Sequence, residues 1–145
     1  MVKRILVALD NSAIADKAMR QALDLAKLYK AQLFAVSVIN YSVIGEIDES
    51  SPSPMVTETI YYWTNSFQKV LDKCKQLAGE LGIAHYHQAM LSGYPAEEII
   101  KYAEKKNIDL IVMGHIGKSA AAGFLIGSVS QKVSTHSKCS VLIVK

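Results

Sequence analysis

Between Ile108 and Gly117 the chain reads Ile-Asp-Leu-Ile-Val-Met-Gly-His-Ile-Gly, and after nine more residues it continues with Gly127-Ser128. The apolar run before Gly114 has the length of a buried strand, and the residues after Gly127 have a helical pattern. Glycine permits positive φ and lets a ligand approach the main chain, while a helix start offers unpaired N–H groups to an anion. The stretch therefore predicts a strand, a phosphate-binding loop and a helix, with the Ser128 hydroxyl at the helix cap.

The same glycines also have a purely structural interpretation. Gly114 would end the strand, Gly117 would form a turn, and Gly127-Ser128 would begin an ordinary helix. Glycine spacing alone does not separate the two interpretations, so the decision rests on the rest of the chain.

Strand-like and helical segments alternate outward from this stretch. Short apolar runs predict five strands, at Arg4–Leu9, Gln32–Ile39, Ile83–Leu91, Asp109–Met113 and Val141–Val144. Apolar residues at three- and four-residue steps predict four helices, at 13–30, from about residue 55 to Gly82, at 95–107 and at 128–136. Alternating strands and helices favour a parallel sheet between two helical layers, a three-layer α/β sandwich.

Length and composition indicate one globular domain, residues 1–145. Hydrophobic residues make up 50% of the chain and charged residues 20%, as is typical of a soluble protein. The apolar runs are too short to span a membrane, and the N-terminus does not resemble a signal peptide, so we expect a cytoplasmic protein. The net charge of +3 is too dispersed to indicate nucleic-acid binding. Cys74 and Cys139 are expected to stay reduced, and no Cys/His spacing indicates a metal site.

A family resemblance favours the phosphate-binding interpretation. Glycine, two residues, glycine, nine residues, glycine and then Ser or Thr is the pattern of nucleotide-binding universal stress proteins, and residues 114–128 match it. The resemblance continues through Lys3–Ser12, Gly93–Ile100 and Ser140–Val144, and only about residues 40–54 lack a counterpart. It implies a Rossmann-like, adenine-nucleotide alpha-hydrolase-like sheet with strand order 3-2-1-4-5.

In that order the second and third strands lie on one side of the first strand, and the fourth and fifth lie on the other side. The strand order therefore reverses between the first and fourth strands. Ligands of such sheets bind at the carboxyl ends of the strands where the order reverses. Asp10 ends the first strand and Gly114 ends the fourth, so these two distant parts of the chain should face one crevice.

The resemblance assigns the phosphates of ATP, ADP or AMP to the glycine motif. By similarity to the family, main-chain groups of Gly117 and Gly127, with Ser128, Val129 and Ser130, would hold them. Mg²⁺ or Mn²⁺ would bind to the phosphates rather than to a separate protein site.

The resemblance also implies a place for the nucleoside. Met113 and Gly114 would flank the ribose, and the main chain of Val38 would contact the adenine edge. Asp10 would accept a hydrogen bond from a ribose hydroxyl or orient a metal-bound water. The alternative for Asp10 is a helix-capping role without ligand contact. Position 116 is often basic or aromatic in the family but is Ile116 here, so His115 and Lys118 are the nearest candidates to offset phosphate charge.

The expected activity is regulatory nucleotide binding. No catalytic residue is predicted, because phosphoryl transfer needs an aligned nucleophile and charge stabilisation in addition to a phosphate cradle. The Walker and dinucleotide-binding glycine patterns are missing. Three alternatives remain: an interaction module of the same fold without nucleotide, slow ATP hydrolysis, and an ATP pyrophosphatase, whose Ser-Gly-Gly loop after the first strand is not found at Leu9–Ala13.

Two further expectations concern assembly and mobility. Val141–Val144 is apolar and lies at the sheet edge in the expected order, so its unpaired main chain predicts a homodimer through this strand. An unidentified regulatory protein is the other expected partner. The polar segment from Tyr41 to Pro54 offers little apolar surface and is expected to be mobile and dispensable for folding. The aromatic run Tyr61-Tyr62-Trp63 is expected to be core or dimer surface, with base stacking as the alternative.

Overall fold

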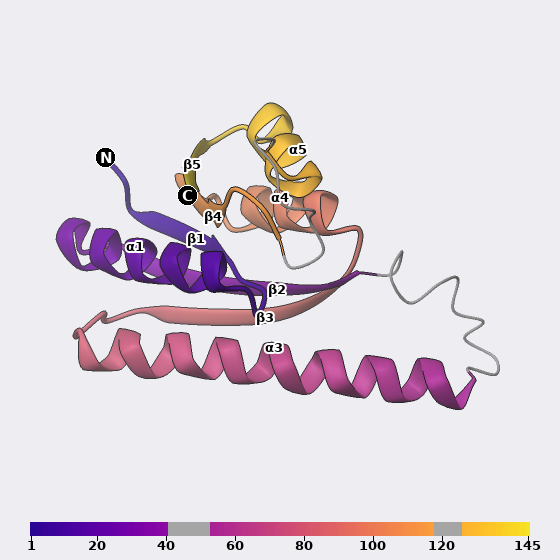
Figure 1. The fold of residues 1–145 in the computed structure, drawn as a ribbon. Coiled ribbons are helices and arrows are strands. Elements are labelled where there is room, and N and C mark those ends of the chain that lie inside the picture. The colour runs from indigo at the N-terminus through magenta and orange to yellow at the C-terminus, as the bar shows by residue number, and fades with distance from the viewer. Residues whose placement is uncertain (41–52, 118–125) are drawn as a thin grey trace.

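A computed structural model of the chain describes residues 1–40, 53–117 and 126–145. Within those ranges it contains five strands and four helices (Figure 1). The strands are β1 (Arg4–Ala8), β2 (Gln32–Asn40), β3 (Tyr86–Gly93), β4 (Leu110–Gly114) and β5 (Ser140–Val144). The helices are α1 (Ala13–Tyr29), α3 (Pro54–Glu80), α4 (Pro95–Lys105) and α5 (Ser128–His136).

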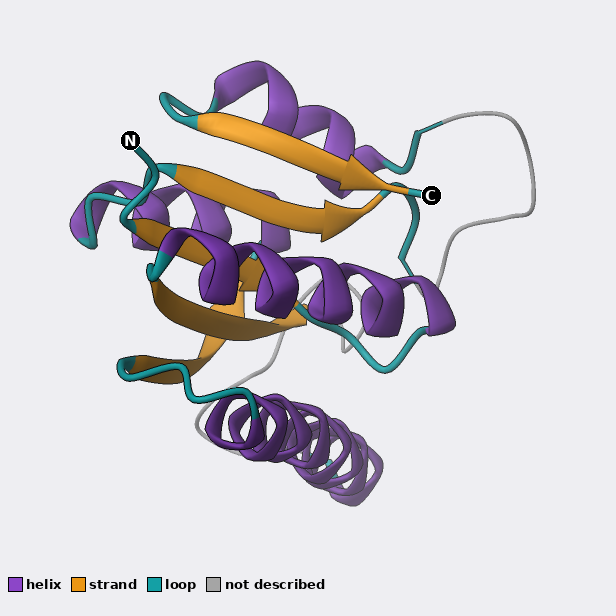
Figure 2. Ribbon diagram, turned by 90° about the vertical axis from the view of Figure 1, so that its left-hand side faces the viewer, coloured by secondary structure: helices purple, strands orange, loops and turns teal. Residues whose placement is uncertain are grey.

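The strands form one parallel sheet with the order β3-β2-β1-β4-β5. This confirms the predicted fold class and strand order. The central strand β1 is buried on both faces, with Ile5, Leu6 and Val7 fully inaccessible, because helices cover both sides of the sheet (Figure 2). One apolar cluster joins α1 and α3 to one face of the sheet, and a second joins α4 and α5 to the other.

A side-chain cap begins α1 after the turn from β1. Ser12 is the N-cap residue, and its hydroxyl accepts a hydrogen bond from the N–H of Ala15 at 3.1 Å. The helix ends one residue earlier than predicted, at Tyr29, because Lys30 adopts a left-handed conformation with φ 54°.

The third strand begins later than predicted. Gly82 has a φ of +73°, as expected for the residue that ends the preceding helix. The N–H of Ile83 then bonds back to the carbonyl of Ala78 at 2.9 Å, so Ile83 completes the helix end instead of starting a strand. β3 pairs with β2 from Tyr86 to Gly93 and thereby extends two residues beyond the predicted end.

Some expectations concern residues outside the described ranges. The segment predicted to be mobile, Tyr41–Pro54, is one of them up to residue 52. Its last two residues are described and belong to the start of α3, where Ser53 is the N-cap residue and Pro54 is the first helical residue. Lys118 lies outside the described ranges as well. Among the described helices, none combines the length and the apolar character that crossing a membrane requires.

Candidate functional site

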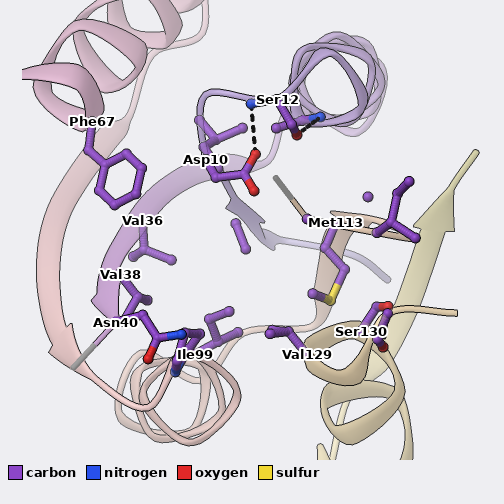
Figure 3. Close-up of a pocket in the computed structure, with 18 of the residues that line it drawn as sticks. Asp10, Ser12, Val36, Val38, Asn40, Phe67, Ile99, Met113, Val129 and Ser130 are labelled. Atoms are coloured by element: carbon purple, nitrogen blue, oxygen red, sulfur yellow. Dashed lines mark hydrogen bonds between the residues drawn. The ribbon is translucent and has the colours of Figure 1, made fainter. Parts of the chain in front are cut away.

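A cleft of about 540 Å³ opens at the carboxyl ends of β1, β2 and β4 (Figure 3). Its size lies within the range of small-molecule sites. The cleft brings together segments that are far apart in the sequence. It is lined by the nine residues to which the family resemblance assigned nucleotide contacts: Asp10, Val38, Met113, Gly114, Gly117, Gly127, Ser128, Val129 and Ser130.

The cleft exists because the chain leaves the sheet in opposite directions from its two central strands. The ladder between β1 and β2 ends with the bond from the N–H of Leu9 to the carbonyl of Val36, at 2.8 Å. The chain then turns into α1 on one face, while the segment after β4 leads to α5 on the other face. The space between the diverging segments is the predicted crevice at the reversal of strand order.

Close packing, and not positive φ, accounts for the glycines at positions 114 and 127, while Gly117 is only mildly crowded. Among the described glycines only Gly82 and Gly93 have positive φ, so the expectation of positive φ in the motif is wrong. A Cβ on Gly114 would collide with Cγ2 of Ile14. A Cβ on Gly127 would lie 3.2 Å from the carbonyl oxygen of His115, and a Cβ on Gly117 would lie 3.3 Å from Oδ2 of Asp10. Bare main chain therefore lines this side of the cleft.

The start of α5 presents main-chain donors at the same place. Gly127 is the N-cap residue and Ser128 is the first helical residue, so the expected capping role of the Ser128 hydroxyl is wrong. The first intrahelical bond runs from the N–H of Gln131 to the carbonyl of Gly127, at 3.0 Å. The N–H groups of Ser128, Val129 and Ser130 precede that bond and have no intrahelical acceptor. All three residues line the cleft.

Ser130 fixes the loop before α5 against the helix. Its side chain is 2% exposed, and its hydroxyl is 2.7 Å from the carbonyl oxygen of His115 and 3.0 Å from that of Gly127. The N–H of Gly127 also donates to the carbonyl of His115, at 2.7 Å. Since both bonds tie residue 115 to the helix start, the position of the main-chain donors depends on Ser130.

Asp10 faces the glycine loop from the other side of the cleft. Its Oδ1 accepts a hydrogen bond from the N–H of Ser12 at 2.9 Å, which orients the carboxylate. Asp10 is the one charged side chain among the described lining residues. Mg²⁺ typically binds one or two carboxylates together with substrate phosphates, so a single carboxylate here suits a phosphate-bound ion. The described residues contain no cluster of three side chains that would hold a metal by themselves.

Val38 offers main-chain groups to the cleft. In a parallel strand, alternate residues direct both N–H and C=O toward the same neighbour. Gln32 donates to Lys3 and Val36 accepts from Leu9, so even-numbered residues of β2 face β1. β1 ends at Ala8, and beyond Leu9 no described strand lies beside β2 on that side. The N–H and C=O of Val38 consequently point into the open space.

Several lining residues were not predicted from the sequence. Asn40 ends β2, Pro95 and Ile99 lie in the first turns of α4, and Trp63 and Phe67 lie on α3. The strand end and the helix start were available as signals for Asn40 and Pro95. Trp63 belongs to the aromatic run for which base stacking was the alternative interpretation, while Phe67, four residues along the same helix face, resembles any core-facing residue and gave no such signal.

His115 was expected to offset phosphate charge, but it lies outside the cleft. Its main-chain N–H donates to the carbonyl of Val144 at 2.8 Å, and its ring Nδ1 is 3.2 Å from the same oxygen. The side chain is therefore directed to β5. Ile116, its neighbour, lines the cleft in its place.

Comparison with known proteins gives a consistent result. A family model described as "Universal stress protein family" matches residues 1–145. Universal stress protein MJ0531 from Methanocaldococcus jannaschii is 34% identical over 145 residues, which cover all of this chain and 83% of that protein. The solved structure of hypothetical protein MJ0577 aligns with a TM-score of 0.87 at 28% identity, covering 100% of this chain and 96% of the other. A universal stress protein solved in complex with cAMP aligns with a TM-score of 0.75 at 25% identity, covering 99% and 97%.

Proposed function

The chain belongs to the universal stress protein family, and from that premise we propose that its cleft binds an adenine nucleotide, with ATP as the expected ligand. One observation carries the proposal: residues from four separate segments, which together are expected to contact the phosphates, the ribose and the adenine, line a single cavity. The related protein solved with cAMP supports the choice of an adenine nucleotide.

The phosphates belong at the start of α5. The free N–H groups of Ser128, Val129 and Ser130, together with the positive end of the helix dipole, favour an anion there. Gly117 and Gly127 put no side chain at this end of the cleft, so a ligand meets main chain there. Mg²⁺ or Mn²⁺ on the phosphates, with Asp10 holding a coordinated water, would offset the negative charge that the ligand and Asp10 share.

The adenine belongs beside Val38. The N–H and C=O of this residue form a donor and acceptor pair at the open side of β2, which suits the alternating acceptor and donor edge of adenine. The ribose would then lie between the base and the phosphates, next to Met113 and Gly114 and within reach of Asp10.

The role that fits these groups is regulatory binding, with occupancy altering a homodimer or the binding of another protein. Fast phosphoryl transfer requires cationic groups and a positioned nucleophile. The described lining contributes main-chain donors, hydroxyls and one carboxylate, which hold a nucleotide but supply no cation to a transition state. An interaction module without nucleotide remains the competing function, and the free amides at the start of α5 argue against it.

A thermal-shift experiment tests the proposal. A ligand at one hundred times its dissociation constant adds about 2.7 kcal/mol to stability, which raises the melting temperature of a domain of this size by several degrees. We expect ATP with Mg²⁺ to produce this rise and Ser128→Ala to diminish it at equal ATP concentration. His136→Ala is the matched control, because His136 lies on α5 outside the cleft. Unchanged melting temperatures with millimolar ATP, ADP, AMP and cAMP would refute nucleotide binding.

A further inference from the structure

Of the three residues in the aromatic run Tyr61-Tyr62-Trp63 on α3, only Trp63 lines the cleft. Tyr61 and Tyr62 are 70% and 61% exposed. Trp63 is partly buried and lines the cleft together with Phe67, which is 3% exposed. The two rings meet edge to face, with centroids 5.3 Å apart and an interplanar angle of 60°. Trp63 and Phe67 thus form an aromatic wall of the cleft. Neither tyrosine lines the cleft, but the ring of Tyr62 packs edge-on against Trp63, with centroids 6.5 Å apart.

The sheet determines how a flat ligand would lie beside this aromatic wall. Main-chain hydrogen bonds of a strand lie close to the plane of its sheet. A planar ring that pairs with the N–H and C=O of Val38 therefore continues the sheet in the space that β1 leaves open. Its two faces point toward the two helical layers. One layer contributes α3 with Trp63 and Phe67, and the other contributes α4 with Pro95 and Ile99.

The close-up view agrees with this arrangement. Phe67 and Ile99 lie on opposite sides of the opening, with Val36 and Val38 of β2 between them (Figure 3). Of the two walls, the one on α3 is aromatic and the one on α4 is aliphatic. A two-ring base covers more of an aromatic wall than a one-ring base does, so it buries more ring surface and stacks more strongly.

We propose that the aromatic wall formed by Trp63 and Phe67 stacks on the base of the ligand and makes the cleft selective for purine over pyrimidine nucleotides. This inference rests on the proposed nucleotide binding and assigns a specificity-determining role to Trp63. Phe67 supports Trp63 from the core, and Trp63 itself is only partly buried, which favours its replacement without opening the interior.

Calorimetric titration of wild type, Trp63→Leu and Tyr61→Leu with AMP and with UMP tests the inference. We expect Trp63→Leu to weaken AMP binding about tenfold and UMP binding less, so that the ratio of the two affinities falls. Tyr61→Leu, two positions away on the same helix and 70% exposed, is expected to match wild type. Trp63 is the only tryptophan, so its fluorescence should be quenched by AMP in wild type and in Tyr61→Leu.

The outcomes separate this inference from the proposed function. Wild-type protein that binds none of these nucleotides refutes nucleotide binding itself. Nucleotide binding with an unchanged AMP affinity in Trp63→Leu, or with equal losses for AMP and UMP, overturns the stacking role alone. If Trp63→Leu fails to fold, Trp63→Phe replaces it and is expected to retain the purine preference, and wild-type fluorescence that AMP leaves unchanged then overturns the inference.

Discussion

Replacing Gly117 with valine separates ligand binding from folding more cleanly than any other change in the cleft. The φ of Gly117 is not positive, and the residue is exposed, so valine meets no backbone penalty of the kind that a left-handed position imposes. The added Cβ would lie 3.3 Å from Oδ2 of Asp10, a contact that a shift of a few tenths of an ångström in one side chain relieves. The fold is therefore expected to survive.

The effect on binding is expected to be large. The valine side chain would project into the end of the cleft, beside Asp10 and near the start of α5, where the phosphates are proposed to lie. Displacing a phosphate from one main-chain donor removes a charge-assisted hydrogen bond of about 1.5–3 kcal/mol. The affinity for ATP with Mg²⁺ should fall about ten- to a hundredfold, measured by calorimetric titration.

Gly114→Ala is the contrasting variant. Its methyl group collides with Ile14 in the packed contact between β4 and α1, so it should reduce stability by about 1–3 kcal/mol and lower the melting temperature. Equal ATP affinity in wild type and a folded Gly117→Val would refute the assignment of phosphates to this loop. A Gly117→Val protein that unfolds as readily as Gly114→Ala would refute the packing argument.

Three further variants examine other parts of the molecule. Ser130→Ala removes the hydroxyl that lies near the carbonyls of residues 115 and 127, so stability should fall by about 1 kcal/mol and ATP affinity should weaken as well; a variant with both unchanged would contradict the anchoring role. Ile143→Pro should turn the predicted dimer into a monomer in light scattering. The carbonyl of Val144 accepts from the N–H of His115 on the β4 side, so the N–H of Ile143 faces the open edge of the sheet, and proline removes it. A persisting dimer would place the interface elsewhere. Burial raises the pKa of Cys74 to about 11, so the folded thiol keeps its proton where the unfolded thiol loses it. The free energy of unfolding that this protonated thiol contributes is fully present below about pH 9, and about 3 kcal/mol of it is lost as the pH rises toward 11. In Cys74→Ala, the free energy of unfolding measured with urea should therefore fall less between pH 9 and 11; the same fall as in wild type would contradict this role of Cys74.

Local patterns were sufficient to predict the sheet and the ends of the strands that form the site. Apolar runs separated by helical patterns gave all five strands, and a family resemblance supplied their order. The convergence of Asp10 and Gly114 on one crevice followed from that order, since Gly114 ends β4 and Asp10 follows the end of β1 by two residues. These inferences depend on chain topology and need no knowledge of side-chain packing.

Tertiary packing decides what the sequence did not predict. The direction of His115 depends on a bond to β5, which lies about thirty residues away in the chain. The need for glycine at position 114 depends on Ile14 of another element, and not on its own φ. The aromatic wall of Trp63 and Phe67 reaches the cleft only because α3 lies beside the end of β2. Each of these facts involves a partner that no local pattern specifies.

The central claim is that main-chain groups at the end of β2 and the start of α5 hold an adenine nucleotide. Two-dimensional NMR of the ¹⁵N-labelled protein, titrated with ATP and Mg²⁺, observes those groups directly. The account predicts that the largest shifts occur at the amides of Val38, Gly117, Ser128 and Val129, with little change along the distant end of α5. A saturating titration that leaves these four amides unchanged, or that moves a different part of the protein alone, would contradict it.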